Sequence, residues 1–150
     1  GKMKVVIALG SNLGDRAANI EGAISKISDF CKVIEVSKLF ETAPVGGPEQ
    51  PDYLNAVLVG DCELDPHELL IKCLEIENQF GRTREVRWGA RTLDIDLILV
   101  GGTEVNSENL ILPHPLAHTR KFVLEPWYSI DPTAVIPGRG PISQLLAALN

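Results

Sequence analysis

Two aspartates, Asp94 and Asp96, are separated by one residue inside an otherwise apolar run. Successive side chains of a β-strand point to opposite faces, so a strand here places both carboxylates on one face, about 6.5 Å apart. The opposite face would be apolar and turned to the core, with Leu93, Ile95, Leu97 and Leu99. Two like charges this close repel unless a cation lies between them, and Mg²⁺ binds one or two protein carboxylates together with water and phosphate oxygens. The pair predicts a magnesium site, although a solvated strand face without metal is the alternative that this spacing alone leaves open.

A cluster of arginines precedes this pair. Four of the seven arginines lie within residues 82–91, against the single acid Glu85, and they are Arg82, Arg84, Arg87 and Arg91. Guanidinium groups present planar forks to phosphate oxygens, and a loop can carry them onto a bound polyphosphate. Metal-binding carboxylates beside such a cluster favour phosphoryl transfer on a nucleotide, where the protein mainly positions groups and neutralises charge. No Walker loop or dinucleotide fingerprint is present, and a solvated basic loop is the alternative interpretation.

The elements that must position these residues follow from apolar periodicity. Strands are expected at 4–9, 32–41, 53–59 and 92–100, and helices at 15–30 and 66–80. This order predicts an α+β, ferredoxin-like βαββαβ fold, an antiparallel sheet with both helices packed on one face. The strand at 32–41 should contain an irregularity, and a loop rich in proline and glycine fills 43–51. From residue 103 we expect a C-terminal extension with six prolines and one short helix at 142–149.

The composition fits one globular domain spanning residues 1–150, with 45% hydrophobic and 23% charged residues. The sequence contains neither an apolar run long enough for a membrane helix nor a signal peptide. Three cysteines without a C-x-x-C pair fit a reducing cytosol, so a cytoplasmic location is expected. A net charge of −6 with one local basic patch suits a small polyanion better than duplex nucleic acid. An RNA-binding module is the alternative from another class, but aromatic residues are only 5% and its aromatic signature is missing.

Four motifs together carry a family resemblance. They are Ala8-Leu9-Gly10-Ser11-Asn12-Leu13-Gly14, Thr42-Ala43-Pro44 with Gln50-Pro51-Asp52-Tyr53-Leu54-Asn55-Ala56, Arg87-Trp88-Gly89-Ala90-Arg91-Thr92-Leu93-Asp94-Ile95-Asp96, and Pro113-His114. With them the sequence resembles the 6-hydroxymethyl-7,8-dihydropterin pyrophosphokinases of folate biosynthesis. The resemblance implies transfer of the β,γ-diphosphate of ATP to the hydroxymethyl oxygen of the reduced pterin, releasing AMP, with two Mg²⁺ ions. The partners implied are these two small-molecule substrates, with no nucleic acid or membrane, for a monomeric enzyme.

The resemblance also implies a role for each matching residue. Asp94 and Asp96 would bind both ions and, with Arg82 and Arg91, form the catalytic set. ATP would be contacted by Glu77, Arg87, Trp88, Arg91, Ile98, His114 and Arg120. The pterin would be contacted by Thr42, Ala43, Pro44, Val45, Tyr53, Asn55 and Phe122. Another two-metal phosphoryl transferase and a small-ligand regulatory domain are the remaining alternatives, and neither explains both the 42–55 segment and the arginine cluster.

Overall fold

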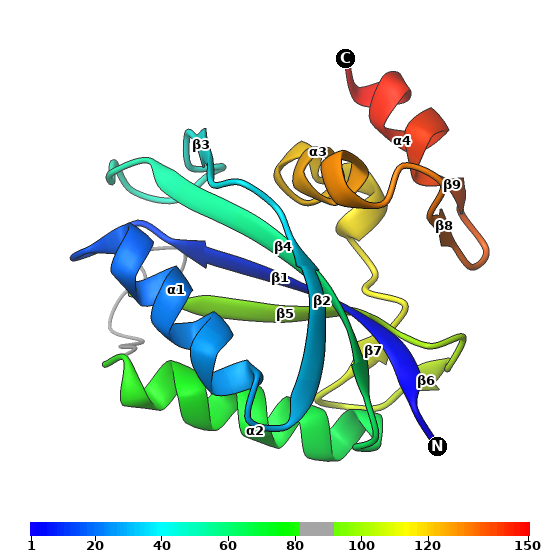
Figure 1. Cartoon of the computed structure of the whole chain (residues 1–150). Helices are drawn as coiled ribbons and strands as arrows, with labels where there is room; N and C mark the ends of the chain where they lie inside the picture. Colours follow the sequence, from blue (N-terminus) through cyan, green and yellow to red (C-terminus); the bar gives the residue numbers. More distant parts are fainter. Residues whose placement is uncertain (82–91) are drawn as a thin grey trace.

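The computed structural model describes residues 1–81 and 92–150. Within these residues the main sheet has five strands, all paired antiparallel. Four of them lie in the order β2-β4-β1-β5, and β3 pairs with β4 beyond the end of β2 (Figure 1). Their bounds are β1 Met3–Ser11, β2 Cys31–Val36, β3 Phe40–Thr42, β4 Tyr53–Cys62 and β5 Asp94–Val100. The middle of this sheet is therefore formed by β1 and β4.

Helices cover both faces of the sheet (Figure 1). On one face lie α1 (Arg16–Ile27) and α2 (Pro66–Gln79), whose apolar side chains form a first core with Val5, Ile7 and Leu9 of β1. On the other face lies α3 (Lys121–Ile130), which forms a second core with Val6 and Ala8. Because both faces are covered, β1 is apolar on both sides.

The second half of the chain completes the covering of that other face. A short 3₁₀ turn, Ala117–Thr119, leads into α3, and α4 (Ile142–Leu149) packs beside it. Two small hairpins connect these elements, namely β6 (Val105–Asn106) with β7 (Ile111–Leu112), and β8 (Val135–Ile136) with β9 (Gly140–Pro141). No helix among the described residues is long and apolar enough to cross a membrane.

The prediction of a single helix after residue 103 is wrong, because α3 is a second one. Pro126 lies inside α3, and a proline there removes one main-chain hydrogen bond and crowds the preceding turn. Val123, Leu124 and Trp127 are buried on the face that α3 turns to the sheet. Their burial outweighs the local cost, which sequence periodicity interrupted by prolines did not reveal.

Two strand predictions also need correction. The single strand expected at 32–41 is two strands, because the buried Ser37 lies between them and exchanges hydrogen bonds with Val57 of β4, each 2.9 Å long. In β5, the pairing with β1 shifts register so that Ile98 is an extra residue. This bulge turns Leu99 toward the second core, so Leu99 does not share the face of Leu97.

Candidate active site

One row of residues crosses the middle strands of the sheet on the side of α3. Gly10 of β1 lies opposite Asn55 of β4 and opposite Asp94 of β5. Directly paired residues share a face, and the next pairs along the strands bring Ala8 beside Asp96. Leu93, Ile95 and Leu97 are buried in the first core instead. The two carboxylates therefore share one face, as their alternation predicted.

The asparagine at one end of this row is buried and held in place. Asn55 is 5% exposed, and its Nδ2 donates to Oγ1 of Thr42 at 2.6 Å. A Cβ atom at Gly10 would lie 3.2 Å from Oδ1 of Asn55 and 3.4 Å from Cδ1 of Tyr53. The lack of a side chain at Gly10 thus lets the side chains of Asn55 and Tyr53 lie close against β1.

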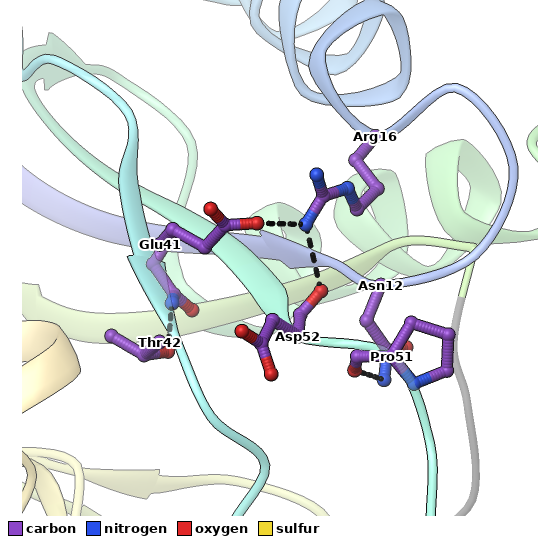
Figure 2. A network of polar contacts seen from close by, with 7 residues as sticks. Asn12, Arg16, Glu41, Thr42, Pro51 and Asp52 are labelled. Carbon is purple, nitrogen blue, oxygen red and sulfur yellow. Dashed lines mark hydrogen bonds and ion pairs between the residues drawn. The ribbon is translucent and has the colours of Figure 1, made fainter.

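The loop 43–51 is tied at both ends to the start of α1 (Figure 2). Asn12, 1% exposed, donates from Nδ2 to Oε1 of Gln50 and to the carbonyl of Pro51, each at 2.9 Å. Arg16 donates from Nη1 to Oε2 of Glu41 at 2.8 Å and to the carbonyl of Asp52 at 2.9 Å. Neither Asn12 nor Arg16 was predicted to have a role, because contacts across more than twenty residues leave no local signal in the sequence.

The predicted pterin residues on this loop differ in exposure. Pro44 is half-buried, while Ala43 is exposed and Val45 is 80% exposed. Thr42 and Tyr53, which pair directly across β3 and β4, are half-buried beside Asn55. The structure thus brings Thr42, Tyr53 and Asn55 together, and leaves Val45 in solvent.

The start of α3 brings a cation and an aromatic ring toward Asp96. Nη1 of Arg120 lies 4.0 Å from Oδ2 of Asp96, and the guanidinium carbon lies 5.5 Å from the ring centre of Phe122. The Asp96 side chain is 46% exposed, so solvent screens this weak ion pair. Arg120 and Phe122 lie 65 or more residues beyond the 42–55 segment in sequence. They reach the same side of the sheet because α3 covers it.

His114 borders the outer edge of β5. Its main-chain N–H donates to the carbonyl of Ile98 at 2.9 Å, and its Nδ1 accepts the N–H of Leu116 at 3.1 Å. Burial, and next the positive charge of Arg120, lower the pKa of His114 to about 4. At neutral pH the ring is therefore uncharged, and because Nδ1 accepts, Nε2 carries the proton and can donate.

Two further predicted ATP residues are buried. Ile98 is 1% exposed and its side chain packs in the second core, so its contact with ATP stays a prediction that would involve its main chain. Glu77 of α2 is 4% exposed, and its Oε2 accepts the N–H of Ile95 at 2.7 Å. The remaining residues predicted to contact phosphate lie outside the described residues, namely Arg82, Arg84, Arg87, Trp88 and Arg91.

The chemistry of Asp94 and Asp96 fits Mg²⁺. No group of three or more histidine, cysteine, aspartate or glutamate side chains that could hold a metal occurs in the described ranges 1–81 and 92–150. Two half-buried carboxylates on one strand face match an ion that takes one or two protein carboxylates and fills its other positions with water and phosphate oxygens. The fold and the site define a class, a protein of mixed helices and antiparallel sheet with a two-carboxylate site on one sheet face.

Comparisons with known proteins then give the family. The chain matches 7,8-dihydro-6-hydroxymethylpterin-pyrophosphokinase (HPPK) over residues 6–132. It is 44% identical over 162 aligned residues to the 2-amino-4-hydroxy-6-hydroxymethyldihydropteridine pyrophosphokinase of Mycobacterium tuberculosis, covering 98% of this chain and 84% of that protein. The protein of the same name from Bacillus subtilis is 44% identical over 122 residues, covering 80% and 73%. The chain belongs to the HPPK family.

Solved structures agree on the fold. Wild-type HPPK-DHPS of Plasmodium falciparum with pteroate superposes with a TM-score of 0.79 at 14% identity, covering 99% of this chain. A further HPPK-DHPS structure, in complex with substrates, gives a TM-score of 0.76 at 12% identity. The chain spans 42% and 43% of those two solved chains.

Proposed function

We propose that this protein transfers the β,γ-diphosphate of ATP to the hydroxymethyl group of 6-hydroxymethyl-7,8-dihydropterin, releasing AMP, in folate biosynthesis. Membership of the HPPK family supports the reaction. The row Asn55, Gly10, Asp94 is the observation that carries it for this chain. Neighbouring strands lie about 4.8 Å apart, so a ring held at Asn55 has its reacting arm within reach of phosphates held at Asp94.

At the phosphate end, Asp94 and Asp96 would hold two Mg²⁺ ions. When bound, the metal neutralises phosphate charge and orients the reacting groups. Arg120, beside Asp96, adds a fixed positive charge for the phosphates. His114, neutral with its proton on Nε2, donates a hydrogen bond to a phosphate oxygen without competing for metal. We assign Arg82, Arg87, Trp88 and Arg91 to the same triphosphate on the strength of their sequence motif.

At the pterin end, an amide and aromatic rings would bind the flat heterocycle. The Asn55 carboxamide can pair with the hydrogen-bonding edge of the ring, and Thr42 fixes its orientation. Tyr53 and Phe122 supply aromatic surface on the same side of the sheet, where ring stacking adds to apolar burial. Gly10 lets the side chains of Asn55 and Tyr53 lie close to β1, where the ring would bind.

The fold unit, the domain organisation and the location of the protein are also part of the proposal. The strand order β2-β4-β1-β5 with α1 and α2 on one face supports a ferredoxin-like βαββαβ unit, to which α3, α4 and the hairpins are a C-terminal extension. We propose that residues 1–150 form one domain that acts as a monomer on its two small-molecule substrates, without nucleic acid. The cytoplasmic location stays a prediction from the cysteine pattern.

An assay for AMP from ATP, Mg²⁺ and the pterin tests the proposal. Wild-type protein should release AMP only when pterin and metal are both present, and Asp94→Ala should reduce the rate by about a hundredfold or more, as loss of charge stabilisation in the transition state does. Asp61→Ala is the matched control, because Asp61 lies at the opposite end of the sheet, beside Lys4. AMP or ADP release without pterin would point instead to another two-metal phosphotransferase.

A further inference from the structure

Glu77 is an acidic residue in an apolar position. The buried residues of α2 are Leu69, Cys73, Ile76 and Glu77, and the first three belong to the first core. Removing a carboxylate from water is unfavourable unless the charged oxygens receive hydrogen bonds. A capped helix with an apolar face needs no acid at this place for its own stability. The contacts of Glu77 therefore indicate what the acid does.

The carboxylate of Glu77 bonds to the strand that carries the two aspartates. Oε2 accepts the main-chain N–H of Ile95 at 2.7 Å, a short hydrogen bond. Ile95 is the residue between Asp94 and Asp96, and β5 is the last strand of the described sheet, paired with β1 on one side. The orientation of this peptide group sets the directions in which both neighbouring side chains leave the backbone.

Other groups hold β5 on either side of this point. The side chain of Asn19 in α1 donates to the carbonyl of Thr92 at 3.2 Å, and the main chain of His114 donates to the carbonyl of Ile98 at 2.9 Å. Both contacts lie outside the aspartate pair, whereas the Glu77 contact lies within it. Glu77 is thus placed to fix the spacing and direction of the carboxylates themselves.

We infer that Glu77 is a positioning residue for the metal site, acting through the N–H of Ile95 on Asp94 and Asp96. The inference rests on the proposed function for the identity of the metal. It assigns Glu77 a task different from the direct ATP contact that the family resemblance implies. Partners just outside the metal-binding groups orient those groups, and their loss commonly lowers metal affinity about 10- to 100-fold.

Two substitutions separate this task from others. Glu77→Leu removes the acceptor at similar volume, and Glu77→Gln keeps a carbonyl oxygen that can accept the same N–H while removing the charge. Glu75→Leu is the matched control, because Glu75 is exposed on the same helix. The first measurement is hydrogen exchange at the Ile95 amide in ligand-free protein. Exchange there should rise about tenfold or more in Glu77→Leu, following loss of a local hydrogen bond, while the Val6 amide in the sheet centre stays protected.

The second measurement is Mn²⁺ binding, followed by electron paramagnetic resonance with a non-hydrolysable ATP analogue. The dissociation constant for Mn²⁺ should rise about tenfold or more in Glu77→Leu and stay within about threefold of wild type in Glu77→Gln and Glu75→Leu. If Glu77→Leu instead weakens the analogue alone and leaves Ile95 exchange and Mn²⁺ affinity unchanged, Glu77 is a nucleotide contact and the inference is wrong.

If Glu77→Leu has a folding defect, seen as increased exchange at Val6, the Glu77→Gln variant tests the inference instead. A folded Glu77→Gln protein that keeps Ile95 protection and Mn²⁺ affinity supports positioning by the hydrogen bond, and one that loses Mn²⁺ affinity overturns it. Neither readout requires turnover. A wild-type protein that binds Mn²⁺ with the analogue but makes no AMP would therefore reject the proposed reaction and leave the role of Glu77 intact.

Discussion

Gly10 lies between the two ends of the proposed site, and its missing side chain lets Asn55 and Tyr53 lie close against β1. On one side lies Asn55, fixed by Thr42, and on the other lies Asp94. The position has no positive φ, so glycine is needed here for space alone. Gly10 and Asp94 are more than eighty residues apart in the sequence, and only strand pairing shows that they are neighbours.

Gly10→Ala should therefore weaken pterin binding selectively. The new Cβ would lie 3.2 Å from Oδ1 of Asn55, tighter than ordinary contact, and Asn55 is buried and cannot move away freely. We expect KM for the pterin to rise about tenfold, or about 1.4 kcal/mol, with KM for ATP within about twofold of wild type. Steady-state kinetics check this against Gly102→Ala, because a Cβ at Gly102 meets nothing within 4 Å. An equal rise in both KM values would show that the space serves neither substrate in particular.

At the scale of the elements, irregularities in the strands determine where strands end and which residues face each core. The bulge at Ile98 turns two successive apolar residues of β5 toward α3, and Ser37 separates β2 from β3. A further register shift in β2 falls between Val33 and Glu35, where the strand lies at an edge of the sheet. Such bulges bend an edge strand and hinder pairing with a second chain.

Gly60 of β4 permits this part of β2 to approach closely. A Cβ at Gly60 would lie 2.6 Å from the main-chain carbonyl oxygen of Lys32. The backbone of β2 would have to shift to relieve this contact. Gly60→Ala should lower the free energy of unfolding by about 1–3 kcal/mol, the usual cost of overpacking. Urea unfolding followed by circular dichroism measures the change, and Gly102→Ala should stay within about 0.5 kcal/mol of wild type. An unchanged midpoint for Gly60→Ala would mean that β2 moves outward at little cost.

At the scale of the whole molecule, two cores separated by the sheet hold the chain together. Cys31, Cys62 and Cys73 all lie in the first core and are free thiols. Burial, with a smaller contribution from nearby Glu77, raises the pKa of Cys73 to about 12, and burial also raises the pKa of Cys31. The native state therefore favours the neutral thiols of Cys73 and Cys31, while the unfolded state releases their protons near the ordinary value of 9.0.

Burial of the cysteines should affect both thiol labelling and the pH dependence of the free energy of unfolding. At pH 8, a disulfide reagent should label the three thiols at the rate of unfolding and label them rapidly in urea, because the thiolate is the reacting species. Above pH 9 the free energy of unfolding should fall, since the stability contributed by neutral thiols is complete below the unfolded pKa and is lost toward pH 12. Cys73→Ala should make that fall shallower. Rapid labelling of one thiol in native protein would show that the first core opens locally.

The sequence by itself determined the local facts of this protein. Alternation in 93–99 put Asp94 and Asp96 on one strand face, and apolar periodicity in 66–80 predicted α2, because these effects act between near neighbours in the chain. The short motifs that carry the family resemblance could be recognised in the same way, and the match to the HPPK family confirms them.

Only the tertiary structure decided which distant groups meet. The row Asn55, Gly10, Asp94 depends on strand register, and the approach of Arg120 to Asp96 depends on α3, a helix that its proline concealed. The bond from Glu77 to Ile95 joins a helix to an edge strand across the first core. These contacts arise because burial of two apolar faces selects one arrangement of the whole chain, and no local pattern of residues contains that selection.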